Sequence, residues 1–460
     1  MKKTPLDAWI SGKVLPSLGA PLTRRVLEHY HMEQLRELLS RVTQQSPFYR
    51  RRFAGALGEG VENPAAFARL PFTTPADIRE QGLKMLCTSQ DRIERVVTLP
   101  TSGTTGEAKR LFFTEEDLEL TIDFFRHGMS TMVDAGSTVI IFLPGERPDS
   151  VGDLLARGLR RMGVTPIIHG PVRDAVAARE EIRRHKSPCL VGIPTQILSL
   201  ARGDRAGFIP KGWVACVLLS TDYVATAIRE ELENLWGCRV LSHYGLTETG
   251  LGGGVECDAG EGYHLREADL YTEIVDPDTG ALREEGLPGE VVFTTLTRQG
   301  MPLVRYRTGD RARFIPGPCP CGSALPRLGP VQGRIETEVV LRGGERLSMP
   351  LLDEALFPIA GVLDFSAKIT DAPPHDCLHL SLQVCEDEEE RIAREVNAAL
   401  LSVPSVASLF RNRVLTLGSI TFDAAGWFTT GTGKRRIRDD RKREETSSTI
   451  KACSILRLKP

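Results

Sequence analysis

The chain has 460 residues, of which 41% are hydrophobic and 26% are charged, and its formal net charge is −2. This composition is typical of globular proteins, and the length exceeds what one ordinary core supports, so we expect at least two domains. The near-neutral charge excludes a general polyanion-binding protein, and no apolar run reaches the roughly 20 residues that span a bilayer. Since the first residues contain no sustained apolar segment, we expect no signal peptide and a cytoplasmic protein.

The first predicted elements are helices. Leucines and valines at helical spacing predict an amphipathic helix over residues 22–42. In "LPFTTPADIRE" (70–80), Thr74 is placed to cap a helix that starts with Pro75 and has Asp77 in its first turn.

Between residues 110 and 250, apolar runs alternate with helical patterns. Strands are predicted at 137–144, 165–170, 188–194, 213–220 and 238–245, and helices at 151–162, 173–185 and 224–236. Near-continuous apolar strands separated by helices indicate a parallel sheet covered on both faces. Because ligands bind beyond the carboxyl ends of such strands, "VGIPT", "LLSTD" and "LSHYGLTE" mark a candidate site.

The pattern changes after residue 270. Alternating residues that turn at Asp-Pro and Pro-Gly predict an antiparallel meander, and beyond residue 334 short strands surround two helices. The expected fold class is therefore α/β. A large domain (1–334) has parallel sheets covered by helices and a small antiparallel, barrel-like part, and a small α+β domain (335–460) follows. "EDEEER" (386–391) is interpreted as the acidic first turn of a helix and "KRRIRDDRKR" (434–443) as a solvated face.

A loop rich in glycine and hydroxyl groups, "TLPTSGTTGEAKRLFFT" (98–114), is the first candidate for chemistry. Glycines let a backbone approach phosphate closely, hydroxyl and N–H groups donate hydrogen bonds, and the lysine adds positive charge. The loop is not a Walker A sequence, since no Gly-Lys-Ser/Thr closes it, and by itself it could also be a flexible linker.

Three further stretches favour a nucleotide site over a linker. "SHYGLTETG" (242–250) places Tyr244, whose ring can stack on a purine, at a strand end, and Glu248, which can hold phosphate-bound Mg²⁺, four residues later. "RYRTGD" (305–310) ends in Asp310, which can accept from two ribose hydroxyls. "GTGKRRIRD" (431–439) places Lys434 on a glycine-rich loop of the small domain.

Together these motifs resemble the adenylate-forming superfamily of acyl-CoA synthetases, peptide-synthetase adenylation domains and luciferases. The resemblance covers roughly residues 70–440, with the motifs in the superfamily's order. "SPFYRRRF" (46–53), "LPFTT" (70–74) and "CPCGSALPRLGPVQGR" (319–334) are most similar to phenylacetate-CoA ligase and its relatives. The resemblance implies that a carboxylate attacks the α-phosphate of ATP to give acyl-AMP and pyrophosphate. A thiol, usually that of coenzyme A, then takes the acyl group and releases AMP.

The resemblance also implies a role for each motif residue. Lys434 would bridge the attacking carboxylate and the α-phosphate, Thr247 would touch the α-phosphate, and Glu248 would hold Mg²⁺. The remaining cofactor-binding residues would surround ATP: Ser102, Gly103, Thr104, Thr105, Gly106 and Lys109 at the β- and γ-phosphates, Ser220, Thr221, Asp222, Tyr244 and Gly245 at the adenine, and Asp310 and Arg334 at the ribose, where Arg334 could also reach a phosphate.

Two stretches depart from the family's pattern. Relatives usually follow Gly-Arg with x-Asp-Asp, whereas here Ile335, Glu336 and Thr337 follow, which makes Glu336 the expected hinge between the domains. "GGERLSMP" (343–350) stands where Gly-Val-Asn-Val-Phe-Pro is common, and this puts the coenzyme A side in doubt. Neither departure affects the adenylation residues.

Three of the ten cysteines are candidates for a metal site. Cys257 with His264, and the Cys-x-Cys pair Cys319 and Cys321, offer three thiols and an imidazole, the set of a closed structural Zn²⁺ site. Free buried thiols are the alternative. Resemblance to zinc-containing phenylacetate-CoA ligase relatives favours the zinc site.

The expected partners are a small carboxylic acid and coenzyme A. We expect an aromatic or medium apolar acid, with Phe124 and Phe125 either in its pocket or in the core. We expect a monomer or homodimer that binds neither nucleic acid nor membrane. The alternatives are an adenylating enzyme that uses a carrier protein or another acceptor, and a non-catalytic binding protein that keeps the fold.

Overall fold

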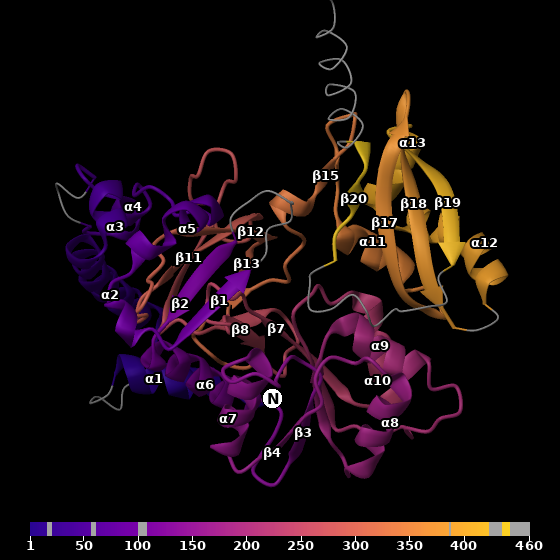
Figure 1. Ribbon diagram of the computed structural model, residues 1–460, viewed down its shortest axis with the longest axis horizontal. Helices are drawn as coiled ribbons and strands as arrows, with labels where there is room; N and C mark the ends of the chain where they lie inside the picture. Colours follow the sequence, from indigo (N-terminus) through magenta and orange to yellow (C-terminus); the bar gives the residue numbers. More distant parts are fainter. Residues whose placement is uncertain (16–20, 57–60, 100–107, 386–387, 423–434, 442–460) are drawn as a thin grey trace, which may run out of the picture.

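The structure is a computed structural model that describes residues 1–15, 21–56, 61–99, 108–385, 388–422 and 435–441 (Figure 1). Within these ranges, no helix combines the length and the apolar character needed to cross a membrane.

Helices form the N-terminal part, as predicted. The helix expected over residues 22–42 is α2, which begins after Thr23, whose hydroxyl accepts the N–H of Val26. Thr74 and Asp77 form the reciprocal capping box that starts the fifth helix. The elements of this part are α1 (Pro5–Val14), α2 (Arg24–Gln45), α3 (Pro47–Arg52), α4 (Pro64–Phe67), α5 (Pro75–Gln81), η1 (Gly82–Met85) and η2 (Gln90–Arg92).

A hairpin that the sequence analysis did not predict flanks the glycine-rich loop. Strand β1 (Arg95–Leu99) pairs antiparallel with β2 (Lys109–Phe113), so that Leu99 faces Lys109. The loop between them, residues 100–107, lies outside the described residues. The apolar end of β2 is buried and leads through a capping box at Thr114 into α6 (Glu115–Met129).

The predicted parallel sheet is confirmed. Its five parallel strands are ordered β4-β3-β5-β6-β7, and their side chains alternate between two cores, one under α6 and α7 and one under α8, α9 and α10. The elements are β3 (Thr138–Ile141), α7 (Val151–Arg160), β4 (Thr165–Ile168), α8 (Ala175–Arg184), β5 (Cys189–Gly192), α9 (Pro194–Arg202), β6 (Cys216–Leu219), α10 (Thr226–Trp236) and β7 (Arg239–Tyr244).

Antiparallel strands extend this sheet beyond β7 to nine strands, an extension the sequence analysis did not predict. The added strands, in the order β8-β9-β14-β13, are β8 (Gly254–Glu256), β9 (Tyr263–Leu265), β14 (Arg327–Leu328) and β13 (Phe314–Ile315). They have two or three residues each, too few for an alternating pattern to be read from the sequence.

The predicted meander is a separate three-stranded antiparallel sheet. Its strands are β10 (Leu270–Val275), β11 (Gly289–Thr295) and β12 (Tyr306–Ala312), in that order. The sheet is open, so the expected barrel-like part does not close among the described residues. β12 ends beside the carboxyl end of β7, where the ring of Tyr244 reaches Asp310.

From residue 335 onward the chain is built around its own four-stranded sheet, ordered β19-β18-β17-β20. This sheet lies beyond helices α9 and α10 of the parallel sheet (Figure 1). Arg202 at the end of α9 joins the two parts by donating to the carbonyls of Phe357 at 2.8 Å and Val362 at 2.6 Å. The elements are η3 (Ile335–Thr337), β15 (Val339–Val340), β16 (Arg346–Leu347), α11 (Met349–Leu356), β17 (Val362–Ala372), β18 (His375–Val384), α12 (Glu389–Ser402), α13 (Pro404–Arg411), β19 (Leu415–Phe422) and β20 (Arg438–Asp439).

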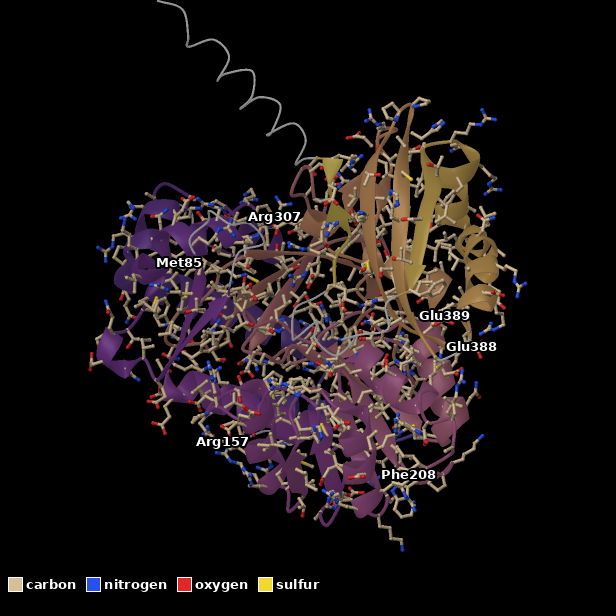
Figure 2. All side chains as sticks on the ribbon, turned by 45° about the vertical axis from the view of Figure 1, so that its right-hand side comes forward. Met85, Arg157, Phe208, Arg307, Glu388 and Glu389 are labelled. Carbon is tan, nitrogen blue, oxygen red and sulfur yellow. The ribbon has the colours of Figure 1, made fainter. Side chains whose placement is uncertain are left out.

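Glu389 and Glu390 occupy the first turn of α12, as the acidic pattern predicted. Glu388 and Glu389 lie at the edge of the C-terminal part that faces α9 (Figure 2). There Glu388 pairs with Arg205 at 3.2 Å.

Candidate active site

The turn after β7 is a rigid platform at the carboxyl end of the parallel strands. The hydroxyl of Thr249 accepts the backbone N–H of Leu246 at 3.1 Å and donates to the carbonyl of the same residue at 2.9 Å. A Cβ on Gly245 would lie 2.5 Å from the carbonyl oxygen of Leu251, so only glycine fits there. Thr247, half-buried, and Glu248, buried, are therefore held in fixed positions.

Glu248 is the centre of a buried polar cluster. Nζ of Lys109 donates to its Oε1, and the hydroxyl of Tyr306 donates to the same oxygen at 2.9 Å. Burial acts to raise the pKa of Glu248, but the Lys109 ammonium and the hydrogen bonds outweigh it and hold this pKa below its ordinary value. Glu248 is therefore ionised at neutral pH, as a ligand for a divalent cation must be. The contact also joins two motifs that lie 139 residues apart in the sequence.

Asp310 is the centre of a second cluster. It is fully buried, and it accepts from the hydroxyl of Tyr244 at 3.1 Å and from Nε of Arg334 at 2.6 Å. Burial and the Asp310 carboxylate raise the pKa of Tyr244, so its hydroxyl stays protonated. The structure thus brings Tyr244, expected at the adenine, together with Asp310 and Arg334, expected at the ribose. A ribose would share the oxygens of Asp310 with these donors.

The chain turns sharply at the end of β6, so that Ser220 and Asp222, on either side of Thr221, contact different parts of the molecule. Thr221 has a φ of 78°, which is unusual for a β-branched residue and marks a sharp turn. On one side of it, the hydroxyl of Ser220 hydrogen-bonds Nδ1 of His243 at 3.0 Å. On the other side, Asp222 accepts from Nε of Arg435 at 3.1 Å. Among the contacts described, Ser220 thus faces the sheet interior and Asp222 the C-terminal part.

Two predicted groups lie outside the described residues. They are the loop residues Ser102, Gly103, Thr104, Thr105 and Gly106, and the lysine Lys434. Their flanks are described: the hairpin β1–β2 on one side, and Arg435, the residue directly after Lys434, on the other.

Arg435 is a site residue that the sequence analysis missed. The interpretation of residues 434–443 as a solvated face is wrong for it, because its side chain is only 8% exposed. Its guanidinium lies 3.1 Å from Asp222, 2.9 Å from Asp353 in α11 and 3.6 Å from Asp364 in β17. Because these carboxylates are distant in the sequence, the only signal for Arg435 was its place after Lys434.

The chain enters the C-terminal part through the short 3₁₀ turn η3, which directly follows Arg334. Glu336 is exposed in η3, while the backbone N–H groups of Thr337 and Glu338 donate to the carbonyl of Arg334 at 3.0 and 3.1 Å. Arg334 itself is attached to Asp310, so the turn starts from a fixed point.

The four predicted metal ligands form a second site, at β8 and β9. The ligand atoms of Cys257, His264, Cys319 and Cys321 all lie within 4.8 Å of one another, and all four residues are buried. The sulfurs of Cys257 and Cys319 are 3.6 Å apart, and Sγ of Cys321 is 3.5 Å from Nε2 of His264. Three thiols and one imidazole at these separations fit a tetrahedral Zn²⁺ ion with no open position.

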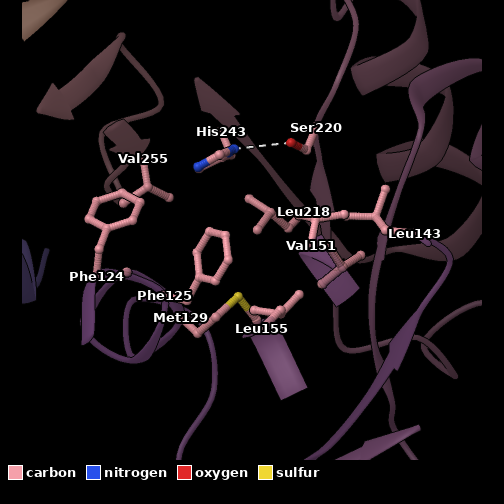
Figure 3. Close-up of a pocket in the computed structure, with 12 residues that line it drawn as sticks. Phe124, Phe125, Met129, Leu143, Val151, Leu155, Leu218, Ser220, His243 and Val255 are labelled. Atoms are coloured by element: carbon pink, nitrogen blue, oxygen red, sulfur yellow. Dashed lines mark hydrogen bonds between the residues drawn. The ribbon is translucent and has the colours of Figure 1, made fainter. Parts of the chain in front are cut away.

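An apolar cavity lies between α6, α7 and the parallel strands (Figure 3). It encloses about 400 Å³ of empty space, including its opening. Phe124 and Phe125 form part of its wall and are also buried, as core residues are. Of its twelve lining residues, ten have apolar side chains or none, and the exceptions are Ser220 and His243.

The family model of the AMP-binding enzymes matches residues 70–297 of this chain. The chain is 30% identical to phenylacetate-coenzyme A ligase of Thermus thermophilus over 332 residues, which are 70% of this chain and 73% of that protein. It is 27% identical to the Escherichia coli protein of the same name over 331 residues, 69% of this chain and 73% of the relative.

Solved structures show the same fold. The crystal structure of 2-hydroxyisobutyryl-CoA ligase in the postadenylation state, in complex with 2-HIB-AMP, superposes with a TM-score of 0.77 at 18% identity, covering 94% of this chain and 93% of the other. The same ligase in complex with 2-HIB-AMP and CoA in the thioesterification state superposes with a TM-score of 0.63 at 20% identity over the same shares.

Proposed function

We infer that this chain, which belongs to the family of AMP-binding enzymes, is an AMP-forming acid–thiol ligase that uses ATP to activate a carboxylic acid and transfers the acyl group to coenzyme A. The main support for this function is that the two buried polar clusters, around Glu248 and around Asp310, meet at one edge of the sheet. There Glu248, Lys109 and Tyr306 lie beside Tyr244, Asp310 and Arg334. The relatives named phenylacetate-coenzyme A ligase support the same reaction.

Each described cluster has a part in the first half-reaction. An oxygen of the substrate carboxylate attacks the α-phosphorus, and the bond to pyrophosphate breaks. Negative charge moves onto the leaving phosphates, so a fixed cation near them lowers the barrier. Lys109, on the strand that leaves the glycine-rich loop, is placed to supply such a charge, and Glu248 would hold Mg²⁺, which neutralises phosphate oxygens when bound. Asp310 and Tyr244 would orient the nucleoside.

In the second half-reaction, the sulfur of coenzyme A attacks the acyl carbon and AMP leaves with its phosphate. We propose that residues 335–460 are a small mobile domain that turns about Glu336 between the two steps. Two arrangements of one relative give TM-scores of 0.77 and 0.63 with this chain, which supports a C-terminal part that can take more than one position. The buried contacts of Arg202 and Arg435 would hold the position described here.

The direct test is ATP–pyrophosphate exchange over a library of carboxylic acids. Aryl and medium apolar acids should support it, because the cavity beside the site has apolar walls. Exchange with such an acid, followed by AMP release that requires coenzyme A, would establish the reaction and its acceptor together. AMP release that does not require coenzyme A would favour a different acceptor.

Glu248→Gln is expected to lower the exchange rate about a hundredfold, because the amide cannot supply the negative charge that holds Mg²⁺. The residual rate should need a higher Mg²⁺ concentration. The matched control is Glu256→Gln, a buried carboxylate that pairs with Arg229 away from this cluster. An exchange rate in Glu248→Gln equal to that of the control, at all Mg²⁺ concentrations, would remove Glu248 from the site.

We propose that Cys257, His264, Cys319 and Cys321 hold a structural Zn²⁺ ion. The expected result of metal analysis after dialysis is one zinc per chain. Cys319→Ser should lose this zinc and lower the melting temperature, because structural zinc contributes directly to folding free energy. Cys216→Ser, which replaces a buried thiol outside the cluster, should keep it. Dialysed, active protein without zinc would contradict the proposal.

The proposed setting is the cytoplasm, with the chain acting as a monomer or homodimer and without nucleic acid or membrane as partner. The small net charge and the absence of a long apolar run in the sequence support this. Light scattering gives the oligomeric state, and filter binding at physiological salt tests the nucleic acid.

A further inference from the structure

His243 is a polar residue that the proposed reaction leaves without a role. It lies at the end of β7 and presents its imidazole to the apolar cavity, where its ring centre is 6.0 Å from that of Phe124 and 6.2 Å from that of Phe125. Burial and the nearby Arg266 guanidinium lower the pKa of His243 to about 4, so the ring is neutral at pH 7. A neutral imidazole has one nitrogen that donates and one that accepts.

Only one of the two ring nitrogens has a partner. Nδ1 lies 3.0 Å from the hydroxyl of Ser220, whereas Nε2 is shielded from solvent and contacts no hydrogen-bonding group of the described chain. Figure 3 shows Nε2 directed away from Ser220, toward the space between Phe124, Phe125 and Val255. A buried nitrogen without a partner costs free energy, so a ligand that pairs with it gains binding over one that does not.

The position of the ring relates this nitrogen to the reacting group. A Cβ on Gly245 would lie 2.7 Å from Cε1 of His243, so the imidazole packs directly under the turn that carries Thr247 and Glu248. Consider an acid whose carboxyl group lies at this turn and whose apolar part lies among the phenylalanines. The atoms of this acid next to its carboxyl group would then lie near Nε2.

We propose that the acid carries a hydroxyl or amino group close to its carboxyl group, as an ortho-substituted aryl acid does, and that Nε2 of His243 recognises this group. The inference rests on the proposed function and narrows its substrate class. A hydroxyl fits either tautomer of His243, because it both donates and accepts, and an amino group fits the tautomer in which Nδ1 donates to Ser220. Ser220 is then a positioning residue that fixes the ring.

The test is ATP–pyrophosphate exchange with benzoate, its 2-, 3- and 4-hydroxy derivatives and 2-aminobenzoate, and with phenylacetate and 2-hydroxyphenylacetate. In the unchanged protein, kcat/KM for the better ortho-substituted acid should exceed that of its unsubstituted parent by about tenfold to a hundredfold. In His243→Phe, which keeps an aromatic ring, this ratio should fall to about one or below. His243→Asn, which keeps a hydrogen-bonding group, should retain part of it.

Phe125→Leu is the matched control in the same wall of the cavity. It should change kcat/KM for parent and substituted acids by similar factors and so leave their ratio unchanged. Circular dichroism and melting temperatures verify that each variant folds.

The outcomes separate this inference from the proposed function. Exchange with parent acids as efficient as with ortho-substituted ones, or a ratio that His243→Phe does not alter, would overturn the role of His243 and leave the ligase reaction intact. Exchange with none of the acids would count against the proposed function and the inference together.

Discussion

Lys434→Ala should lower acyl-AMP formation about a thousandfold while thioester formation from supplied acyl-AMP stays within about tenfold of the unchanged protein. The lysine would stabilise charge that develops only when the carboxylate attacks the α-phosphate. In the second half-reaction the phosphate of AMP already carries this charge, so Lys434 contributes little to lowering the second barrier. Pyrophosphate exchange measures the first step, and coenzyme A-dependent release of AMP from acyl-AMP measures the second.

The anchor next to Lys434 permits a second, structure-based version of this experiment. Arg435, the residue directly after the lysine, forms ion pairs with Asp222 of the parallel sheet and with Asp353 and Asp364 of the C-terminal part. Asp222→Asn weakens the contact between the two parts and leaves the pairs of Arg435 with Asp353 and Asp364 in place. It should therefore lower acyl-AMP formation, by about tenfold, with little change in the second step.

Controls separate positioning from folding in this pair of experiments. Removing Arg435 itself would leave buried carboxylates unpaired and destabilise the C-terminal part, so it is a poor test of positioning. Arg438→Ala, on the same segment but exposed and paired with Asp440, should leave both half-reactions unchanged. Equal losses of both steps in Lys434→Ala would contradict a lysine specific to adenylation.

The parallel sheet could be predicted because its central strands are buried on both faces. Strands β5 (Cys189–Gly192) and β6 (Cys216–Leu219) are fully buried and therefore appear as short apolar runs between helices. The hairpin β1–β2 could not be predicted in the same way. In β1 the exposure alternates without reaching a buried position, so its sequence carries no strong hydrophobic signal.

Residues of the candidate site could be predicted where the side chain itself indicates a chemical role within a short motif. Glu248, Asp310 and Tyr244 stand in short motifs whose chemistry can be argued from the side chains, and the structure places them around one strand end. Arg435 and His243 show the limit. An arginine within a basic segment is usually solvated, and its burial here depends on three aspartates that only the tertiary structure brings together.

His243 fails to stand out for a related reason. In the predicted strand "CRVLSHYG", a polar residue near the strand end is compatible with exposure as much as with a cavity. Its partner Ser220 is 23 residues earlier in the chain, and its aromatic neighbours come from α6. A local pattern therefore cannot distinguish a specificity residue from an ordinary one.

The second substitution with a large expected effect on the half-reactions is Glu336→Pro, in the turn η3. This substitution should lower acyl-AMP formation about a hundredfold and leave thioester formation from acyl-AMP within about tenfold, a barrier change of about 1.4 kcal/mol or less. Proline fixes φ near −65° and disfavours helical backbone at the preceding residue, here Ile335, which lies in the 3₁₀ turn. The arrangement that brings Arg435, and with it the chain next to Lys434, against Asp222 would thus be strained, and other arrangements would be favoured.

Glu336→Ala is the control for this hinge, because it removes the same exposed side chain and leaves the backbone free. It should keep both half-reactions. A parallel fall of both rates in Glu336→Pro, with a lowered melting temperature, would indicate misfolding. Unchanged rates in both steps would move the pivot away from residues 334–337, because a chain that must rotate about Glu336 cannot tolerate a fixed φ at that residue without losing one of its two positions.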